Sequence, residues 1–176
     1  MHSPDSISPA DLDWQAVWST HRRWLRTVVF ARVGNPDVVD EVLQEVALAA
    51  ARSQPALSTA TAGAWLYRVA IRQSLLFRRR RARELRHVEG YGVQHAQVRS
   101  NGPLEPLHWL LADEEHQLLH EAINRLHIKD REILLLKYTE DWNCREIGER
   151  LGLSASAVAT RLDRARGRLR EQLRKS

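Results

Sequence analysis

The sequence has a single cysteine, no long apolar run and no leader-like N-terminus, and each of these shortages excludes something. The lone Cys144 excludes a disulfide within the chain and suits a reducing compartment. No run of 18 apolar residues is present, so we expect no membrane span. The first residues are polar and acidic without an apolar core, which is not the pattern of a signal peptide. We therefore expect a cytoplasmic protein.

Motifs for metal binding and catalysis are missing as well. Cys144 has no C-x-x-C partner, and His116 and His120 are four residues apart but lack the H-E-x-x-H context of a zinc site. The sequence contains no phosphate-binding loop, dinucleotide fingerprint or nucleophile elbow. We expect no metal, no cofactor and no catalytic residue, and so not an enzyme.

What the sequence does have is arginine, concentrated in two places. The formal net charge of +5 conceals seven arginines against one acid in residues 72–86, and seven basic residues against two acids in residues 161–175. Basic clusters of this kind favour polyanions, because binding releases the counterions that surround a nucleic acid.

The second cluster belongs to a pattern of two helices joined by a tight turn, over residues 143–173. Gly152 is placed to end the first helix in a left-handed conformation, and Ser154 to cap the second. The second helix has one apolar stripe, made of Val158, Leu162, Ala165, Leu169 and Leu173. This is the pattern of a helix-turn-helix, whose second helix enters the DNA major groove. An ordinary helical hairpin with a solvated basic face is the alternative.

If that stripe is buried, the remaining positions of the second helix face DNA. Thr160, Asp163 and Arg164 then project together toward the groove, and Arg161 meets phosphate at the edge. Arginine can bind guanine in a bidentate manner and aspartate can accept from cytosine, although Asp163 can instead pair with a neighbouring arginine. The candidate DNA-reading residues are Ser154, Ser156, Thr160, Arg161, Asp163 and Arg164.

Helical periodicity continues through most of the rest of the chain, and we find no convincing strand. We expect a disordered segment over residues 1–11, a helix from about 12 to 33, a second from about 38 to 52, and a loop of about ten residues within 53–64. A third helix then runs into the arginine cluster. Residues 87–109 contain glycines and prolines without a period and predict a flexible linker. The prediction is an all-α protein of two small helical domains, 12–86 and 110–176, the second containing the helix-turn-helix.

Three stretches in this order resemble one family. They are DEVLQE at 40–45, AWLYRVA at 64–70, and residues 126–173 with REILLL and EIGERLGLS. The chain resembles the bacterial sigma factors of the extracytoplasmic-function (ECF) type. Some positions depart from that family's pattern: Ala47, Arg72, Leu76, His127, Ala159 and Asp163.

The resemblance implies a function for each domain. The first would bind the clamp of core RNA polymerase and the −10 promoter element, and the second would bind the polymerase flap and read the −35 element. An anti-sigma factor or another inhibitor is an implied partner. The implied polymerase-binding residues are Asp40, Glu41, Gln44 and Glu45. The implied −10 and single-strand DNA residues are Ser58, Thr59, Ala60, Thr61, Trp65, Tyr67, Arg68, Arg72, Arg78 and Arg79.

Each of these surfaces has a simpler interpretation beside it. The acidic face of residues 40–45 is in most proteins only a solvated helix face. Trp65 can fill the core between helices, whereas a DNA-melting role would use aromatic stacking of single-stranded bases beside a basic groove. A helix-turn-helix is also compatible with two other functions: a dimeric regulator that binds operator DNA alone, and a DNA-processing enzyme such as a recombinase. The linker and the acidic face favour a sigma factor over the first, and residues 12–85 offer no catalytic domain for the second.

Overall fold

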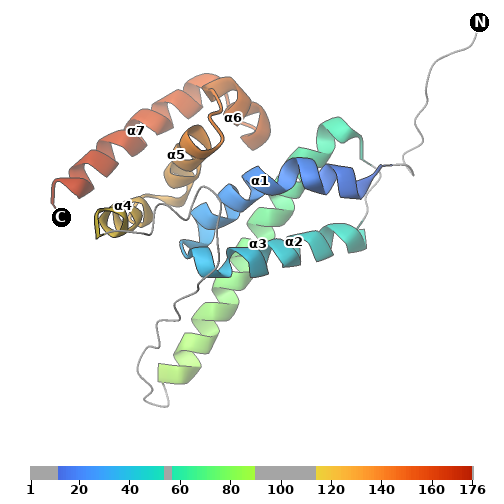
Figure 1. The fold of residues 1–176 in the computed structure, drawn as a ribbon, viewed down its shortest axis with the longest axis horizontal. Helices are drawn as coiled ribbons and strands as arrows, with labels where there is room; N and C mark the ends of the chain where they lie inside the picture. The colour runs from blue at the N-terminus through green and yellow to red at the C-terminus, as the bar shows by residue number, and fades with distance from the viewer. Residues whose placement is uncertain (1–11, 54–56, 90–113, 176) are drawn as a thin grey trace, which may run out of the picture.

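The computed structural model describes residues 12–53, 57–89 and 114–175, and all regular structure in that part of the chain is helical. Seven α-helices and one short 3-10 helix follow one another without a strand among these residues (Figure 1). The all-α prediction is confirmed. The expected disordered segment 1–11 and nearly all of the expected linker lie outside the described residues.

The first helices form where the sequence signals placed them. Helix α1 spans Trp14–Val33; Asp13 caps its start and Gly34 ends it with a left-handed φ of 72°. A single 3-10 turn, η1 (Pro36–Val38), leads into α2 (Val39–Ser53). Asn35 caps that turn through its side chain. The two helices bury an apolar core against α3, formed by Val28, Val39, Val42, Val46, Leu66 and Ala70 among others.

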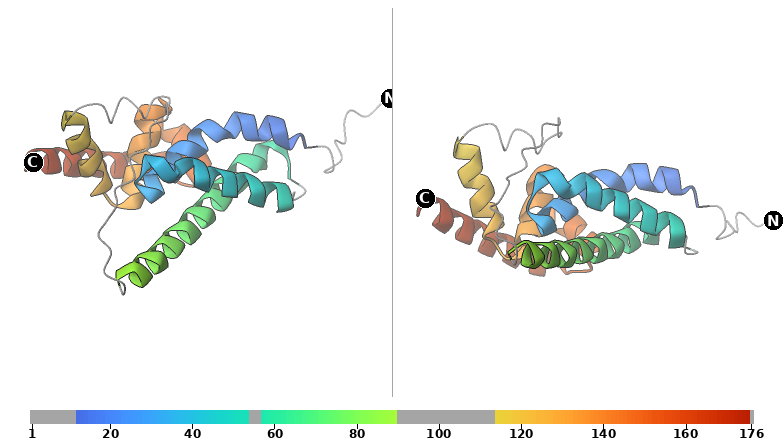
Figure 2. Two further views of the ribbon diagram at one scale, coloured as in Figure 1. Left: turned by 60° about the horizontal axis from the view of Figure 1, so that its bottom comes forward. Right: turned by 90° about the horizontal axis from the view of Figure 1, so that it is seen from below.

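Helix α3 is longer at both ends than the sequence indicated. It spans Thr59–Glu89, so the predicted ten-residue loop was wrong, and the linker cannot begin at residue 87. At the start, Ser58 O accepts backbone N–H groups of Thr61 and Ala62, and the Ser58 and Thr61 hydroxyls lie 3.1 Å apart. With these bonds, small residues that are also typical of loops form the first turn of the helix. The C-terminal half of α3 projects away from the other helices (Figures 1 and 2).

The second group of helices contains the predicted helix-turn-helix. Helix α4 spans Glu114–Asn124, α5 Ile128–Thr139, α6 Cys144–Leu151 and α7 Ala155–Leu173. Helices α4, α5 and α6 all pack against α7 or against each other around Ile133, Leu136, Ile147, Val158 and Leu162. His127, one of the departures from the family pattern, caps α5 by accepting the Lys129 N–H.

The two groups of helices lie against each other. Helix α1 packs along α5, and α3 meets α6 (Figure 2). The buried side chains therefore form one continuous cluster that includes residues of both groups, such as Trp24, Phe30, Leu126 and Leu135. None of the helices in the described ranges is both long and apolar enough to cross a membrane.

Candidate nucleic-acid interface

A capping box fixes the start of α6, and two glycines shape the turn that follows it. The Asn143 side chain accepts the N–H groups of Arg145 and Glu146, while Glu146 accepts the Asn143 N–H at 2.7 Å, completing a capping box. Gly152 ends α6 with a φ of 68°. Gly148 passes so close to the turn that a Cβ on it would lie 2.5 Å from the Leu153 carbonyl oxygen.

Helix α7 buries the apolar stripe that the sequence predicts. Ser154 caps it by accepting the Ala157 N–H at 3.2 Å, and Val158, Leu162 and Ala165 are buried. The other predicted DNA-reading residues lie on the outer side. Arg161 is half-buried at the edge, and the following are exposed: Ser154, Ser156, Thr160, Asp163 and Arg164. Five of the six candidates are therefore exposed at the start of α7 or along it, and Ala159 is half-buried.

Two arginines of α7 make side-chain contacts with α5. Arg168 donates to the carboxylate of Asp130 at 3.0 Å, and the Asp130 side chain is only 6% exposed. Arg166 donates to the Tyr138 hydroxyl at 3.0 Å and lies 3.6 Å from Asp163. The sequence left open whether Asp163 pairs with an arginine, and in the structure it lies beside Arg166. These contacts fix α7 on α5, and pattern reasoning could not find them because their partners are 28 and 38 residues apart.

The acidic face of α2 is divided between paired and open residues. Asp40 is bound by Arg26 of α1, and Glu41 by Arg80 of α3. Gln44 and Glu45 are exposed on the following turn. The four predicted residues do share one side of α2, but Asp40 and Glu41 already interact within the chain, so Gln44 and Glu45 are the residues most open to a partner.

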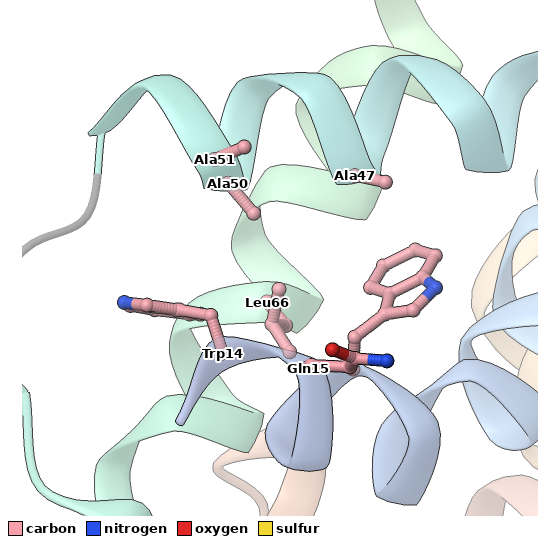
Figure 3. Close-up of a pocket in the computed structure, with 7 residues that line it drawn as sticks. Trp14, Gln15, Ala47, Ala50, Ala51 and Leu66 are labelled. Atoms are coloured by element: carbon pink, nitrogen blue, oxygen red, sulfur yellow. The ribbon is translucent and has the colours of Figure 1, made fainter. Parts of the chain in front are cut away.

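A small apolar pocket lies beside this face. Figure 3 shows Trp14 and Leu66 beneath the small residues Ala47, Ala50 and Ala51 of α2. The pocket has a volume of about 220 Å³ and is also lined by Gln15 and Trp18. Ala47, one of the departures from the family pattern, is among the small residues that line this hollow.

The ten residues predicted for single-strand DNA lie along α3 and at its start. Eight are exposed, and Trp65 and Tyr67 are half-buried. Trp65 packs edge-to-face on Trp14, with ring centroids 5.4 Å apart, so it contributes to the packing between helices. Arg78 and Arg79 border an open groove of about 480 Å³ between α3 and the end of α1. Leu76, another departure, is 45% exposed.

Tyr67 lies where the two groups of helices meet. Its hydroxyl is 3.4 Å from Arg32 Nη2, and its ring lies 5.9 Å from the Arg32 guanidinium carbon. The Arg32 guanidinium also binds Glu132 of α5 at 2.7 Å. Burial and the Glu132 carboxylate raise the pKa of Tyr67 well above its ordinary value. Sequence reasoning placed Tyr67 toward DNA and missed Arg32 and Glu132.

Among the described residues, no three histidine, cysteine, aspartate or glutamate side chains are grouped so that they could hold a metal ion. Cys144 is half-buried at the first position of α6.

Two models of known protein families match this chain. The model of sigma-70 region 2 matches residues 17–84, and the model of sigma-70 region 4 matches residues 116–169. The chain belongs to the sigma-70 family. In this family's terms α2 and most of α3 lie in region 2, and the helix-turn-helix lies in region 4.

Individual relatives agree with this assignment. The chain is 27% identical to the RNA polymerase sigma factor SigV of Bacillus subtilis over 156 residues, which are 88% of this chain and 87% of SigV. It is 30% identical over 115 residues to the ECF sigma factor SigW of the same organism, covering 62% of this chain and 61% of SigW. It is 41% identical to the sigma factor FliA of Pseudomonas aeruginosa over 69 residues, 39% of this chain but only 28% of FliA.

Solved structures show the same fold. One is the sigma factor RpoE of Bartonella quintana in complex with the anti-sigma factor NepR, with a TM-score of 0.59, 20% identity, and coverage of 92% of this chain and 97% of that one. Another is CnrH in complex with the cytosolic domain of CnrY, with a TM-score of 0.60, 21% identity, and coverage of 96% and 94%. The two sigma-70 region models and the similarity to SigW, rather than these structures, confirm the predicted resemblance to the extracytoplasmic-function group.

Proposed function

We propose that this sigma-70 family chain is a non-enzymatic initiation factor that binds core RNA polymerase and directs it to promoters. The observation that carries the proposal is the presence of region 2 and region 4 in one chain, the latter with α7 exposing Thr160, Asp163 and Arg164 beside a series of arginines. The relatives SigV, SigW and FliA are named RNA polymerase sigma factors, which supports polymerase as the partner.

In this proposal region 2 performs two tasks. The exposed Gln44 and Glu45 of α2 contact the polymerase clamp, and charges of this kind mainly orient and speed association. The start of α3 and its arginines hold the melted −10 strand by stacking and by phosphate contacts. Region 4 contacts the flap and lays α7 in the major groove of the −35 element. The protein acts in the cytoplasm, where its promoters and polymerase are.

An inhibitory partner also belongs to the proposal. Two proteins of similar fold, the sigma factor RpoE and CnrH, were solved in complex with the anti-sigma factor NepR and with the cytosolic domain of CnrY, respectively. We propose that this chain, too, is held by an anti-sigma factor or another inhibitor.

The polymerase contact is tested by substituting the two exposed residues of α2. Glu45→Lys and Gln44→Ala should weaken binding to core polymerase, whereas Glu121→Lys, which reverses a 63% exposed carboxylate on α4, serves as the matched control. Equal affinities for all three variants and the original chain would remove α2 from the polymerase interface.

The DNA contact is tested by two arginines of α7. Arg164 is exposed on the groove side and Arg161 lies at the edge. Loss of a base contact costs about 1–3 kcal/mol at one position, whereas loss of a phosphate contact weakens all sequences alike. Transcription from promoters with a randomised −35 element should therefore show a changed base preference for Arg164→Ala. Arg161→Ala should lower activity at every promoter and flatten the salt dependence. The reverse pattern would mean that α7 faces DNA differently.

A further inference from the structure

The contact between the two groups of helices is centred on one buried ion pair. Arg32, near the end of α1, binds the Glu132 carboxylate of α5 at 2.7 Å, and their side chains are 16% and 2% exposed. The pair joins a region 2 cation to a region 4 anion across 100 residues of sequence. It therefore exists only while the two regions lie against each other.

Without Glu132, the chemistry around Arg32 is that of a nucleic-acid site. The guanidinium lies over the Tyr67 ring at 5.9 Å and beside its hydroxyl at 3.4 Å. Trp24 extends the aromatic surface, with its ring centroid 6.4 Å from that of Tyr67. A guanidinium binds phosphate oxygens with strong charge-assisted hydrogen bonds, and aromatic rings stack on unpaired bases. A cation and two rings on neighbouring helices offer both contacts to a single strand.

Glu132 fills this site incompletely. Its Oε1 atom and the Nε of Arg32 are both buried and make no hydrogen bond within the described structure. Burial raises the pKa of Glu132, and Arg32 opposes that shift. A buried ion pair with unsatisfied atoms is a poor source of stability. The carboxylate thus occupies the position of an anion without matching all the donors there.

Other contacts also hold the two groups of helices together, but they do not involve Arg32 or Glu132. Glu140 accepts from Thr27 at 2.9 Å and pairs with Arg23 at 3.2 Å. The Trp24 ring also lies 5.8 Å from Trp142 of the loop before α6. Glu140 therefore offers a control, since removing its charge loosens the same interface without uncovering Arg32.

We infer that Arg32 and Tyr67 form a single-stranded DNA subsite of region 2, which Glu132 of region 4 occupies in the free chain as an internal substitute for phosphate. This inference rests on the proposed function and extends it by a residue, Arg32, and by a built-in competitor. Single-stranded DNA and Glu132 compete for Arg32, so DNA binds this surface only when region 4 has moved away from it.

The first test measures binding of the full-length protein to a fluorescein-labelled, mixed-sequence single-stranded oligonucleotide by anisotropy. Glu132→Gln keeps the side-chain shape and removes the charge. The dissociation constant should fall on the order of tenfold, because the apparent constant is the intrinsic one divided by the fraction of open chains. Adding Arg32→Ala to Glu132→Gln should abolish the gain, and Glu140→Gln should give a much smaller one. No gain from Glu132→Gln, or an equal gain without Arg32, overturns the inference.

A second measurement keeps both Arg32 and Glu132, so its result does not depend on whether the Glu132→Gln variant folds correctly. Fluorophores on Arg52→Cys and Arg174→Cys, in a Cys144→Ser background, report the distance between the two halves. Saturating single-stranded DNA should lower the energy transfer between them, and unchanged transfer with DNA bound refutes the competition. Transcription by core polymerase with the original protein separates the two proposals. If the original protein supports initiation while Glu132→Gln leaves the affinity for single-stranded DNA unchanged, only the inference fails. If the original protein never supports initiation, the proposed function fails.

Discussion

Gly148 offers the sharpest test of how the helix-turn-helix is built. It lies inside α6, where glycine costs about 0.5–1 kcal/mol relative to alanine. The reason for glycine is the turn: a Cβ would lie 2.5 Å from the Leu153 carbonyl oxygen. The Gly148 carbonyl also accepts the N–H groups of both Gly152 and Leu153, so the turn cannot move away without losing these bonds.

The expected cost of Gly148→Ala follows from these opposing terms. The substitution gains up to about 1 kcal/mol of helix propensity. Overpacking against fixed backbone costs about 1–3 kcal/mol and occasionally more. We expect net destabilisation by about 1–2 kcal/mol, and a melting temperature lower by about 2–4 °C for each kcal/mol in a chain of this size.

Gly167 provides the matched control. It also lies within a helix, α7, but a Cβ there would meet no atom within 4 Å. Gly167→Ala should therefore stabilise the chain by about 0.5–1 kcal/mol. Thermal unfolding by circular dichroism measures both variants. If the Gly148→Ala variant is as stable as the Gly167→Ala variant, α6 does not approach the turn as closely as the structure shows.

Three further predictions concern single residues. Asn143→Ala removes the capping box of α6 and should lower the free energy of unfolding by about 1–2 kcal/mol in urea titrations; no loss would mean that the cap does not form. Arg168→Ala leaves Asp130 buried without this partner and should cost about 1–2 kcal/mol, since Arg168 itself is 51% exposed and partly screened; a loss below 0.5 kcal/mol would be that of an ordinary surface position. Burial lowers the pKa of His120 below 6.5, so the folded chain binds fewer protons there than the unfolded chain, and this stabilisation is present above pH 6.5 and lost as the pH falls through the folded pKa. His120→Phe keeps an aromatic ring and should reduce the loss of stability between pH 7.5 and 5.5, whereas an unchanged pH profile would contradict the pKa direction.

Local signals were read correctly from the sequence because each depends on a few neighbouring residues. Gly152 and Ser154 stop and start helices by their own conformation and hydrogen bonding. The buried stripe through Val158, Leu162 and Ala165 follows from helical spacing alone. The same reasoning misjudged the start of α3, because serine, threonine and glycine are typical both of loops and of the first helical turn.

Contacts between distant elements could not be predicted in this way. The pairing of Glu41 with Arg80 and of Arg32 with Glu132 depends on how whole helices are placed, which no spacing pattern encodes. Only the close approach at Gly148 could have been suspected from the sequence, because a glycine inside a helix usually has a packing reason. The assignment of Tyr67 to DNA considered its residue type and neighbours but not the second group of helices that lies over it.

The central claim is that this chain confers promoter specificity on RNA polymerase. The most direct test is transcription in vitro from a genomic promoter library with purified core polymerase, with and without the full-length protein. The account predicts transcripts that depend on the protein and that start downstream of a shared pair of −35 and −10 sequences. Start sites that are the same with and without the protein, together with tight operator binding in the absence of polymerase, would contradict it.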